Sequence, residues 1–206
     1  MKWFWTGWLV CALAAGLFGY MALVEAPAIS AMLGGMALPD AAPLGYGEDQ
    51  ARALHAAFAA DFAAAEAGGR QSASAAYVAL HAGFDLAVPP LLAASLGFLA
   101  FASAYAGRPQ ASPPRLVSIG IGLVLALAFT YLACDFLENA VADAMYGPQA
   151  MQAGFNESFV FVLQVLTRGK YLTLLIAGVL IVALWIARWT GKRGAAPDAG
   201  SSPDQR

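Results

Sequence analysis

Three polar side chains close an otherwise apolar run of the sequence, and they are the first candidates for chemistry. Asp135, Glu138 and Asn139 are spaced i, i+3 and i+4, so a helix places all three on one face. A carboxyl inside a membrane-spanning helix costs about 2.5–3.5 kcal/mol on insertion scales and therefore needs a partner or water. Two carboxyls one turn apart also repel each other when both are ionised. Such a pair could bind a cation, exchange a proton or act as a general acid and base.

Polar residues recur at the same depth in two other apolar runs. About 20 residues span a hydrocarbon core of roughly 30 Å. Counted inward from the basic residue at the end of each run, that length reaches Asp135 in one, Asp85 in another and Arg168 in the third. The counts predict a single polar layer to which three helices contribute. Its expected members are Asp85, Asp135, Glu138, Asn139, Lys170, Arg168, His81, Thr167 and Tyr131.

The members of this layer also have a purely structural interpretation. Asp135, Glu138 and Asn139 could join helices through salt bridges and hydrogen bonds. Arg168 and Lys170 cannot both point inward, because each residue turns about 100° around a helix. One of the two, more readily Arg168, could instead extend to the lipid headgroups.

His81 is expected near Asp85, either as a hydrogen-bonded structural histidine or as part of a metal site with Asp135 and Glu138. This acid-rich set has no diagnostic ligand spacing, so no metal site is predicted. A haem is poorly supported, because the other histidine, His55, lies in a loop. The sequence also lacks the G-x-S-x-G, H-E-x-x-H and phosphate-loop motifs. It therefore indicates neither a catalytic residue nor a cofactor.

The composition indicates the class of molecule. Of the 206 residues, 60% are hydrophobic and only 12% are charged, whereas a soluble domain carries about 25% charged residues. We predict an all-α membrane protein with a single membrane domain over residues 1–190 and a disordered tail over 191–206. The bilayer is its expected partner, and the absence of a basic nucleic-acid patch argues against binding of DNA or RNA.

Four long apolar runs predict a four-transmembrane-helix bundle. Their expected ranges are 3–24, 75–106, 115–145 and 157–189. The first run is longer than the apolar core of a signal peptide, which covers about 7–15 residues, so we expect it to be retained as a spanning helix. Glu25, Pro27 and the Gly34–Gly35 pair are expected to end the first helix, and Pro89 and Pro90 to kink the second.

The loop 25–74 between the first two spans is predicted to carry one additional helix, over 48–67. Leu54, Phe58 and Phe62 give that helix a narrow apolar stripe at i+4 steps. A segment of this size cannot bury a core of its own, so it should lean on the bundle. We expect it to roof a small crevice whose floor is the polar layer.

Charge predicts the orientation in the membrane. Seven of the 11 Lys and Arg residues fall on one predicted side, and only Arg52 and Arg70 lie in the loop 25–74. The positive-inside rule then puts both termini in the cytoplasm and the loop on the outer side. The polar layer would lie near the outer leaflet of an inner (cytoplasmic) membrane.

Three short segments resemble a widespread family of small bacterial four-helix membrane proteins without an established function. They are GFDLAVP at 83–89, DFLEN at 135–139 and LTRGK at 166–170. The resemblance implies four spanning helices in a bacterial inner membrane. It further implies that Asp85, Asp135, Glu138, Asn139, Thr167 and Lys170 form one cluster. It implies no activity, and the long alanine-rich loop is an addition to the pattern.

Three functions fit these observations. The first is binding of a small ligand or a cation at the polar layer. The second is a structural role as an accessory subunit of a membrane complex, with the charges of the layer paired internally and with a partner membrane protein or a second copy of the chain beside it. The third is a membrane enzyme acting on lipid or quinone. No motif demands a reaction, so the sequence leans against an enzyme.

Overall fold

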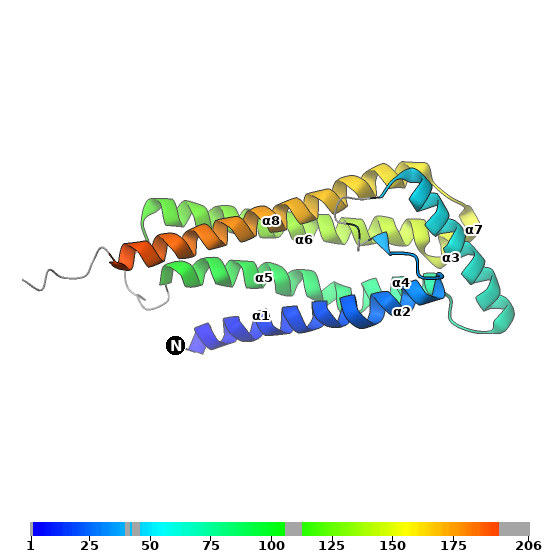
Figure 1. Cartoon of the computed structure of the whole chain (residues 1–206), viewed down its shortest axis with the longest axis horizontal. Coiled ribbons are helices and arrows are strands. Elements are labelled where there is room, and N and C mark those ends of the chain that lie inside the picture. Colours follow the sequence, from blue (N-terminus) through cyan, green and yellow to red (C-terminus); the bar gives the residue numbers. More distant parts are fainter. Residues whose placement is uncertain (1, 40–41, 43–45, 106–112, 194–206) are drawn as a thin grey trace, which may run out of the picture.

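The computed structural model describes residues 2–39, 42, 46–105 and 113–193. Four of its helical stretches are long and apolar enough to cross a membrane, and they run side by side (Figure 1). They are Trp3–Met32, Ala73–Tyr105, Arg115–Tyr146 and Glu157–Thr190. The predicted all-α class, with four spans and a further helix between the first two, is thereby confirmed. The chain is a multi-pass membrane protein.

The first span continues beyond its predicted end near residue 24. It consists of α1 (Lys2–Tyr20), a π-helical turn η1 (Met21–Glu25) and α2 (Ala26–Met32). Pro27 does not stop the helix. Proline has no N–H to donate to the preceding turn, and the wider π turn directly before it allows the backbone to continue without that hydrogen bond. The helix ends before the Gly34–Gly35 pair, which was also expected to stop it and whose φ angles of 69° and 86° favour glycine.

The second span is broken at Gly83, between α4 (Ala73–Ala82) and α5 (Phe84–Tyr105). Gly83 has φ −104° and ψ −108°, which is not helical. Pro89 and Pro90 lie inside α5, so the helical assignment is interrupted before the prolines and continues through them. Proline withholds the N–H that would bond to the carbonyl four residues earlier, which weakens the first turns of α5. The predicted end of this span at 106 lies outside the described residues.

The last two spans are longer than a hydrocarbon core requires. They are α6 (Arg115–Tyr146) and α8 (Glu157–Arg193), with 32 and 37 residues. At about 1.5 Å per residue they measure roughly 48 and 55 Å, against a core of about 30 Å. A short helix that was not predicted, α7 (Pro148–Ala153), connects them. Helix α8 extends into the predicted tail as far as Arg193. The remainder of the tail, 194–206, lies outside the described residues.

The helix of the first loop, α3 (Glu48–Gly68), lies across one end of the bundle, which we call the α3 end (Figure 1). Its buried face consists of Ala51, Leu54, His55, Phe58, Asp61 and Ala65, at helical spacing. Phe62, expected on this face, is only half-buried. The face packs on the α3-end cluster, an apolar core that includes Leu33, Tyr77, Tyr146 and Leu163. These side chains fill the space beneath α3 where a crevice was expected.

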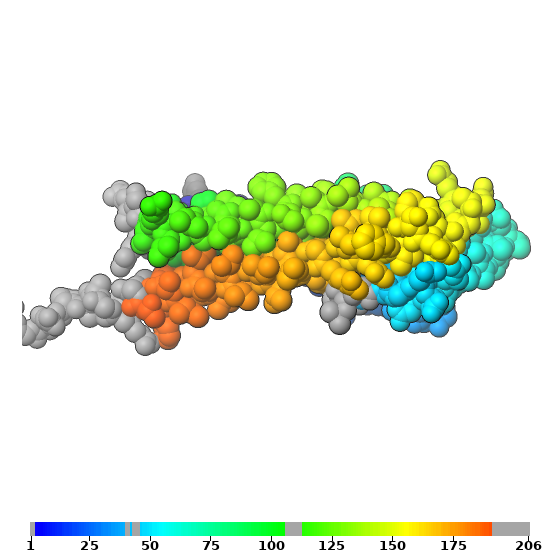
Figure 2. Space-filling model, turned by 90° about the horizontal axis from the view of Figure 1, so that it is seen from above, coloured from blue at the N-terminus to red at the C-terminus, as the bar shows by residue number. Residues whose placement is uncertain are grey.

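A second apolar cluster occupies the opposite end of the bundle. It consists of Leu96, Ala100, Ile121, Val124, Ala128, Ala177, Ile181 and Leu184. The beginning of α1 and the end of α8 both lie at this end (Figure 1). Helices α5, α6 and α8 pack against one another, whereas α1 packs mainly on α5. Figure 2 shows α6 and α8 side by side along the elongated molecule, with α3 at one tip.

Candidate functional site: a buried polar layer

The polar layer lies between the two apolar clusters. On α6 it falls between Ala128 and Ala142, and on α8 between Leu163 and Ala177, which belong to the two clusters on either side. Its buried members are Tyr131, Asp135, Glu138, Asn139, Thr167, Lys170 and Thr173. Asp85, at the first turn of α5, is half-buried. Three helices of the bundle therefore contribute polar groups at one level.

Lys170 joins α8 to two carboxyls of α6. Its Nζ lies 3.2 Å from Asp135 Oδ1 and is ion-paired with Glu138 Oε2. The exposed fractions are 8% for Lys170, 4% for Asp135 and 0% for Glu138, so solvent does little to weaken these contacts. Two carboxyls thus share one ammonium group inside the bundle.

Glu138 also meets a hydroxyl that already has another acceptor. Thr167 Oγ1 is hydrogen-bonded to Glu138 Oε1 and lies 2.8 Å from the Leu163 carbonyl oxygen. A threonine hydroxyl has one hydrogen to donate. It cannot serve a carboxylate and a carbonyl fully at the same time. A proton on Glu138 Oε1 would resolve this, since Glu138 could then donate to Thr167 and Thr167 to Leu163.

Asn139 connects α6 to the start of α5. Its Nδ2 donates a hydrogen bond to Asp85 Oδ2. Asp85 lies in the first turn of α5, where the partial positive charge of the helix N-terminus favours an anion. Asn139 Oδ1 is buried and has no hydrogen-bond partner among the described residues. Asn139 Oδ1 could therefore accept a hydrogen bond from a bound ligand, or from Asp85 if that carboxyl carried a proton.

His81 pairs with an acid that was not predicted. Its Nδ1 lies 2.6 Å from Asp143 Oδ1, one helical turn beyond Asn139 on α6. The imidazole also contacts the ring of Tyr77, with 4.3 Å between ring centroids. The sequence analysis placed His81 beside Asp85. The spacing Asp135, Asn139 and Asp143, at i+4 steps, could have indicated that Asp143 shares their face.

The structure separates the two basic residues of α8. Lys170 points into the bundle, whereas Arg168 is exposed on its surface. Tyr131 is 5% exposed and lies one turn from Asp135 on α6. Of the predicted members, the layer thus brings together Asp85, Tyr131, Asp135, Glu138, Asn139, Thr167 and Lys170; His81 joins it through its own pair with Asp143, and Arg168 lies outside it. Thr173, which is buried and was not predicted, donates to the Lys170 carbonyl oxygen at 2.8 Å.

The ligand groups and hollows of the described residues bear on what this level could hold. Among the described residues, no three His, Cys, Asp or Glu side chains are grouped closely enough to hold a metal ion. Hollows of about 470 and 580 Å³ occur elsewhere. One lies along α8 near the opposite end of the bundle, and the other lies around the turn between α7 and α8. The layer itself is built of contacts between side chains.

No family model, curated protein or solved structure matches this chain. The resemblance carried by segments 83–89, 135–139 and 166–170 therefore does not identify a family. What the four apolar helices support is a four-span membrane protein.

Proposed function

We propose that this membrane protein binds a small cation at its polar layer, and that the cation is a proton. The observation that carries this proposal is the sharing of Lys170 between Asp135 and Glu138. Written as ions, these three groups hold one negative charge in excess. A net charge between two apolar clusters is costly unless it is neutralised. A bound proton supplies the missing positive charge without any new side chain.

The contacts of Glu138 favour a proton over a larger ion. Glu138 is fully buried, and its Oε1 meets a Thr167 hydroxyl that has the Leu163 carbonyl as a second acceptor. With a proton on Oε1, Glu138 donates to the Thr167 hydroxyl and Thr167 donates to the Leu163 carbonyl oxygen, while Lys170 remains the donor to Glu138 Oε2. A proton, unlike a larger ion, also requires no cavity. A divalent metal would need several oxygen or nitrogen ligands, and the described residues offer no such group.

The proposed setting is a bacterial inner membrane with both termini in the cytoplasm. This rests on the basic residues that gather at the end of the bundle opposite α3 and on the positive-inside rule. The polar layer then lies nearer the outer leaflet, beneath α3. Protonation there would change the contacts that hold α5, α6 and α8 together, because the layer draws its residues from all three helices.

Infrared spectroscopy tests this proposal through the carboxyl groups themselves. A protonated carboxylic acid has a C=O stretch that a carboxylate lacks. We expect this band in the parent protein at neutral pH and its loss in Glu138→Gln. The matched control is Glu66→Gln, an exposed glutamate on α3. A parent spectrum without the band, or a band unchanged in both Glu138→Gln and Asp135→Asn, would contradict proton binding.

A second candidate function is that of an accessory subunit with internally paired charges. The ion pairs of Lys170 favour it, because they already connect α6 with α8. In that case the layer holds no exchangeable proton, and its role is to fix the helices in register. The third candidate, an enzyme acting on lipid or quinone, requires a crevice open to lipid beside a carboxyl. The hollow along α8 has no carboxyl in its lining.

A further inference from the structure

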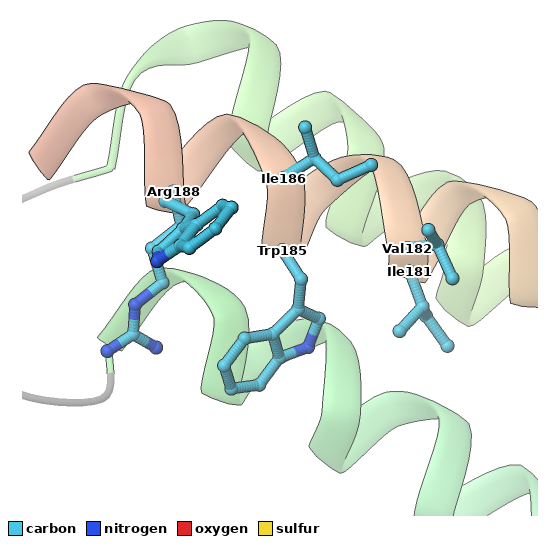
Figure 3. A pocket seen from close by; sticks show the side chains of 6 residues that line it. Ile181, Val182, Trp185, Ile186 and Arg188 are labelled. Atoms are coloured by element: carbon cyan, nitrogen blue, oxygen red, sulfur yellow. The ribbon is translucent and has the colours of Figure 1, made fainter. Parts of the chain in front are cut away.

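The hollow along α8 is an apolar groove that ends at a basic residue. It is lined by Ile181, Val182, Trp185, Ile186, Arg188 and Trp189. Figure 3 shows Arg188 beyond Trp185, toward the end of α8. Its volume of about 470 Å³ falls within the range of about 300–1,000 Å³ found for small-molecule sites. The groove is separate from the polar layer. Arg188 lies roughly 27 Å along α8 from Lys170, at about 1.5 Å per residue.

Two carbonyl groups of α5 hold the end of the groove in place. Trp185 Nε1 donates to the Leu99 carbonyl oxygen at 3.2 Å, and Arg188 donates to the Ala102 carbonyl oxygen at 2.8 Å. The guanidinium also lies over the Trp185 ring, 5.0 Å from its centroid. The cation and the aromatic wall are therefore preorganised and do not depend on a ligand for their positions.

Among the described residues near the groove, the charged groups are basic. Arg188 lies two residues before the end of the fourth candidate span at Thr190, and basic and Trp residues near the ends of spanning helices are typical of the membrane interface. Arg115 begins α6 at the same end of the bundle, and Lys192 and Arg193 follow in the sequence. No Asp or Glu occurs in the described residues of this end, which are 2–20, 91–105, 115–130 and 175–193.

We propose that this groove is a binding site for one anionic phospholipid of the adjoining leaflet. An acyl chain lies along the exposed side chains of Val182 and Ile186, and the lipid phosphate contacts the Arg188 guanidinium. The five N–H donors of a guanidinium allow a phosphate oxygen to bind while the Ala102 contact is kept. Charge selects the headgroup through Arg188, which lines the groove, and the described residues of this end include no acid that would oppose an anion. With the orientation proposed above, this is the cytoplasmic leaflet.

Native mass spectrometry of the full chain tests the site. The protein is equilibrated with equal amounts of phosphatidylglycerol and phosphatidylcholine, and the retained lipids are counted. We expect one retained phosphatidylglycerol and about fivefold less retention in Arg188→Gln, as the loss of one basic group at a membrane surface implies. Val182→Trp, which fills the groove without changing charge, should lower retention as well.

Arg115→Gln is the matched control, because Arg115 is an exposed arginine at the same end of the bundle and outside the groove. It should leave retention unchanged. Equal retention of both lipids, or an equal loss in Arg115→Gln and Arg188→Gln, would overturn the site and leave only a general attraction to anionic membranes. Because Val182→Trp keeps the Arg188 contacts, it tests the groove even if Arg188→Gln fails to fold.

Discussion

Lys170 and Arg168 are two residues apart on α8, yet they have opposite environments. Lys170 is 8% exposed and ion-paired with Asp135 and Glu138, whereas Arg168 is exposed. The helical step of about 100° per residue makes this separation unavoidable. Removal of one partner from a buried ion pair leaves an uncompensated buried charge. Solvent weakens the contacts of an exposed charge, so its removal costs much less. The two residues therefore form a natural pair for mutation.

We expect Lys170→Met to lower the free energy of unfolding by about 3–5 kcal/mol, because two buried carboxyls lose their shared cation. Arg168→Gln should change it by no more than about 0.5 kcal/mol. Denaturant titration in detergent micelles measures both. Adding Asp135→Asn to Lys170→Met should recover part of the loss, because Asp135 is the carboxyl that stays ionised when Glu138 carries the proton. If Lys170→Met proved as stable as Arg168→Gln, the ion pairs of Lys170 with Asp135 and Glu138 would not stabilise the fold.

Depth along the sequence predicted the level of the polar layer, but it could not predict the partners within it. The count from basic residues brings Asp85, Asp135 and Lys170 to one level, because each residue adds a fixed rise along a helix. It contains no information on how each helix is rotated about its axis. The rotation of the helices places His81 against Asp143. It also turns Lys170 into the bundle and Arg168 toward the surface.

Helix α3 is held on the bundle by groups whose charges depend on pH. Burial raises the pKa of Asp61, but the Arg70 guanidinium and the Ala73 N–H lower it by more, so its pKa lies below the ordinary value. Its stabilising effect is present above that ordinary value and is lost only as the pH falls through the lowered pKa. Between pH 5 and 7 Asp61 stays ionised, and its contribution is constant.

His55 is the group of α3 that responds in this range. Burial lowers the pKa of His55, against a smaller opposing effect of its hydrogen bond to the Ala150 backbone. The docked helix therefore prefers the neutral imidazole, packed against the rings of Tyr146 and Phe155. Stability is present above the ordinary pKa of about 6.5. It decreases as the pH falls through the lowered value, because the undocked state binds the additional proton.

We expect amide hydrogen exchange of α3 to show less protection at pH 5 than at pH 7, after correction for the intrinsic pH dependence of exchange. The protection of α6 and α8 serves as the internal reference. In His55→Phe, which keeps an aromatic ring and cannot titrate, this difference should largely disappear. An equal loss of protection in the variant and the parent would assign the effect to another group. The charged neighbours of His55 are Arg52, Glu48 and Glu157, which are exposed and paired with one another, and the effect would then be assigned to them.

The helical class and the number of spans followed from the sequence, while several limits of the helices did not. Long apolar runs predict spans because a bilayer requires them. Pro27 was expected to help end the first helix, but the helix continues through it after a π turn. The interruption of the second span at Gly83, six residues before Pro89, was not predicted. The short helix α7 has too few residues to show a period in the sequence.

At the scale of the molecule, the four spans do not contribute equally. Helices α5, α6 and α8 share both the polar layer and the opposite-end cluster, whereas α1 contributes to neither and packs mainly on α5. Of the residues in its best apolar window, only 11% are buried. The sequence could not predict this arrangement, because hydropathy measures the tendency to enter a membrane and not the lateral neighbours of a helix.

This unequal arrangement makes α1 separable from the rest of the bundle. A Cβ at Gly7 would overlap the ring of Phe98 on α5, whereas a Cβ at Gly16 meets no atom within 4 Å. We expect Gly7→Leu to weaken the α1–α5 contact by about 1–3 kcal/mol, because the Phe98 ring must move. Gly16→Leu, with the same added volume on the same helix, should have no such effect. Thermal unfolding in detergent compares the two variants.

The polar layer should be unaffected by either change. Helix α1 supplies no residue to it, so the infrared carboxyl band expected for Glu138 should keep its intensity in Gly7→Leu even as the stability falls. A loss of that band would show that α1 holds the layer together indirectly, and the layer could then no longer be assigned to α5, α6 and α8 alone. Stability and proton binding are thus expected to respond to different helices of one chain.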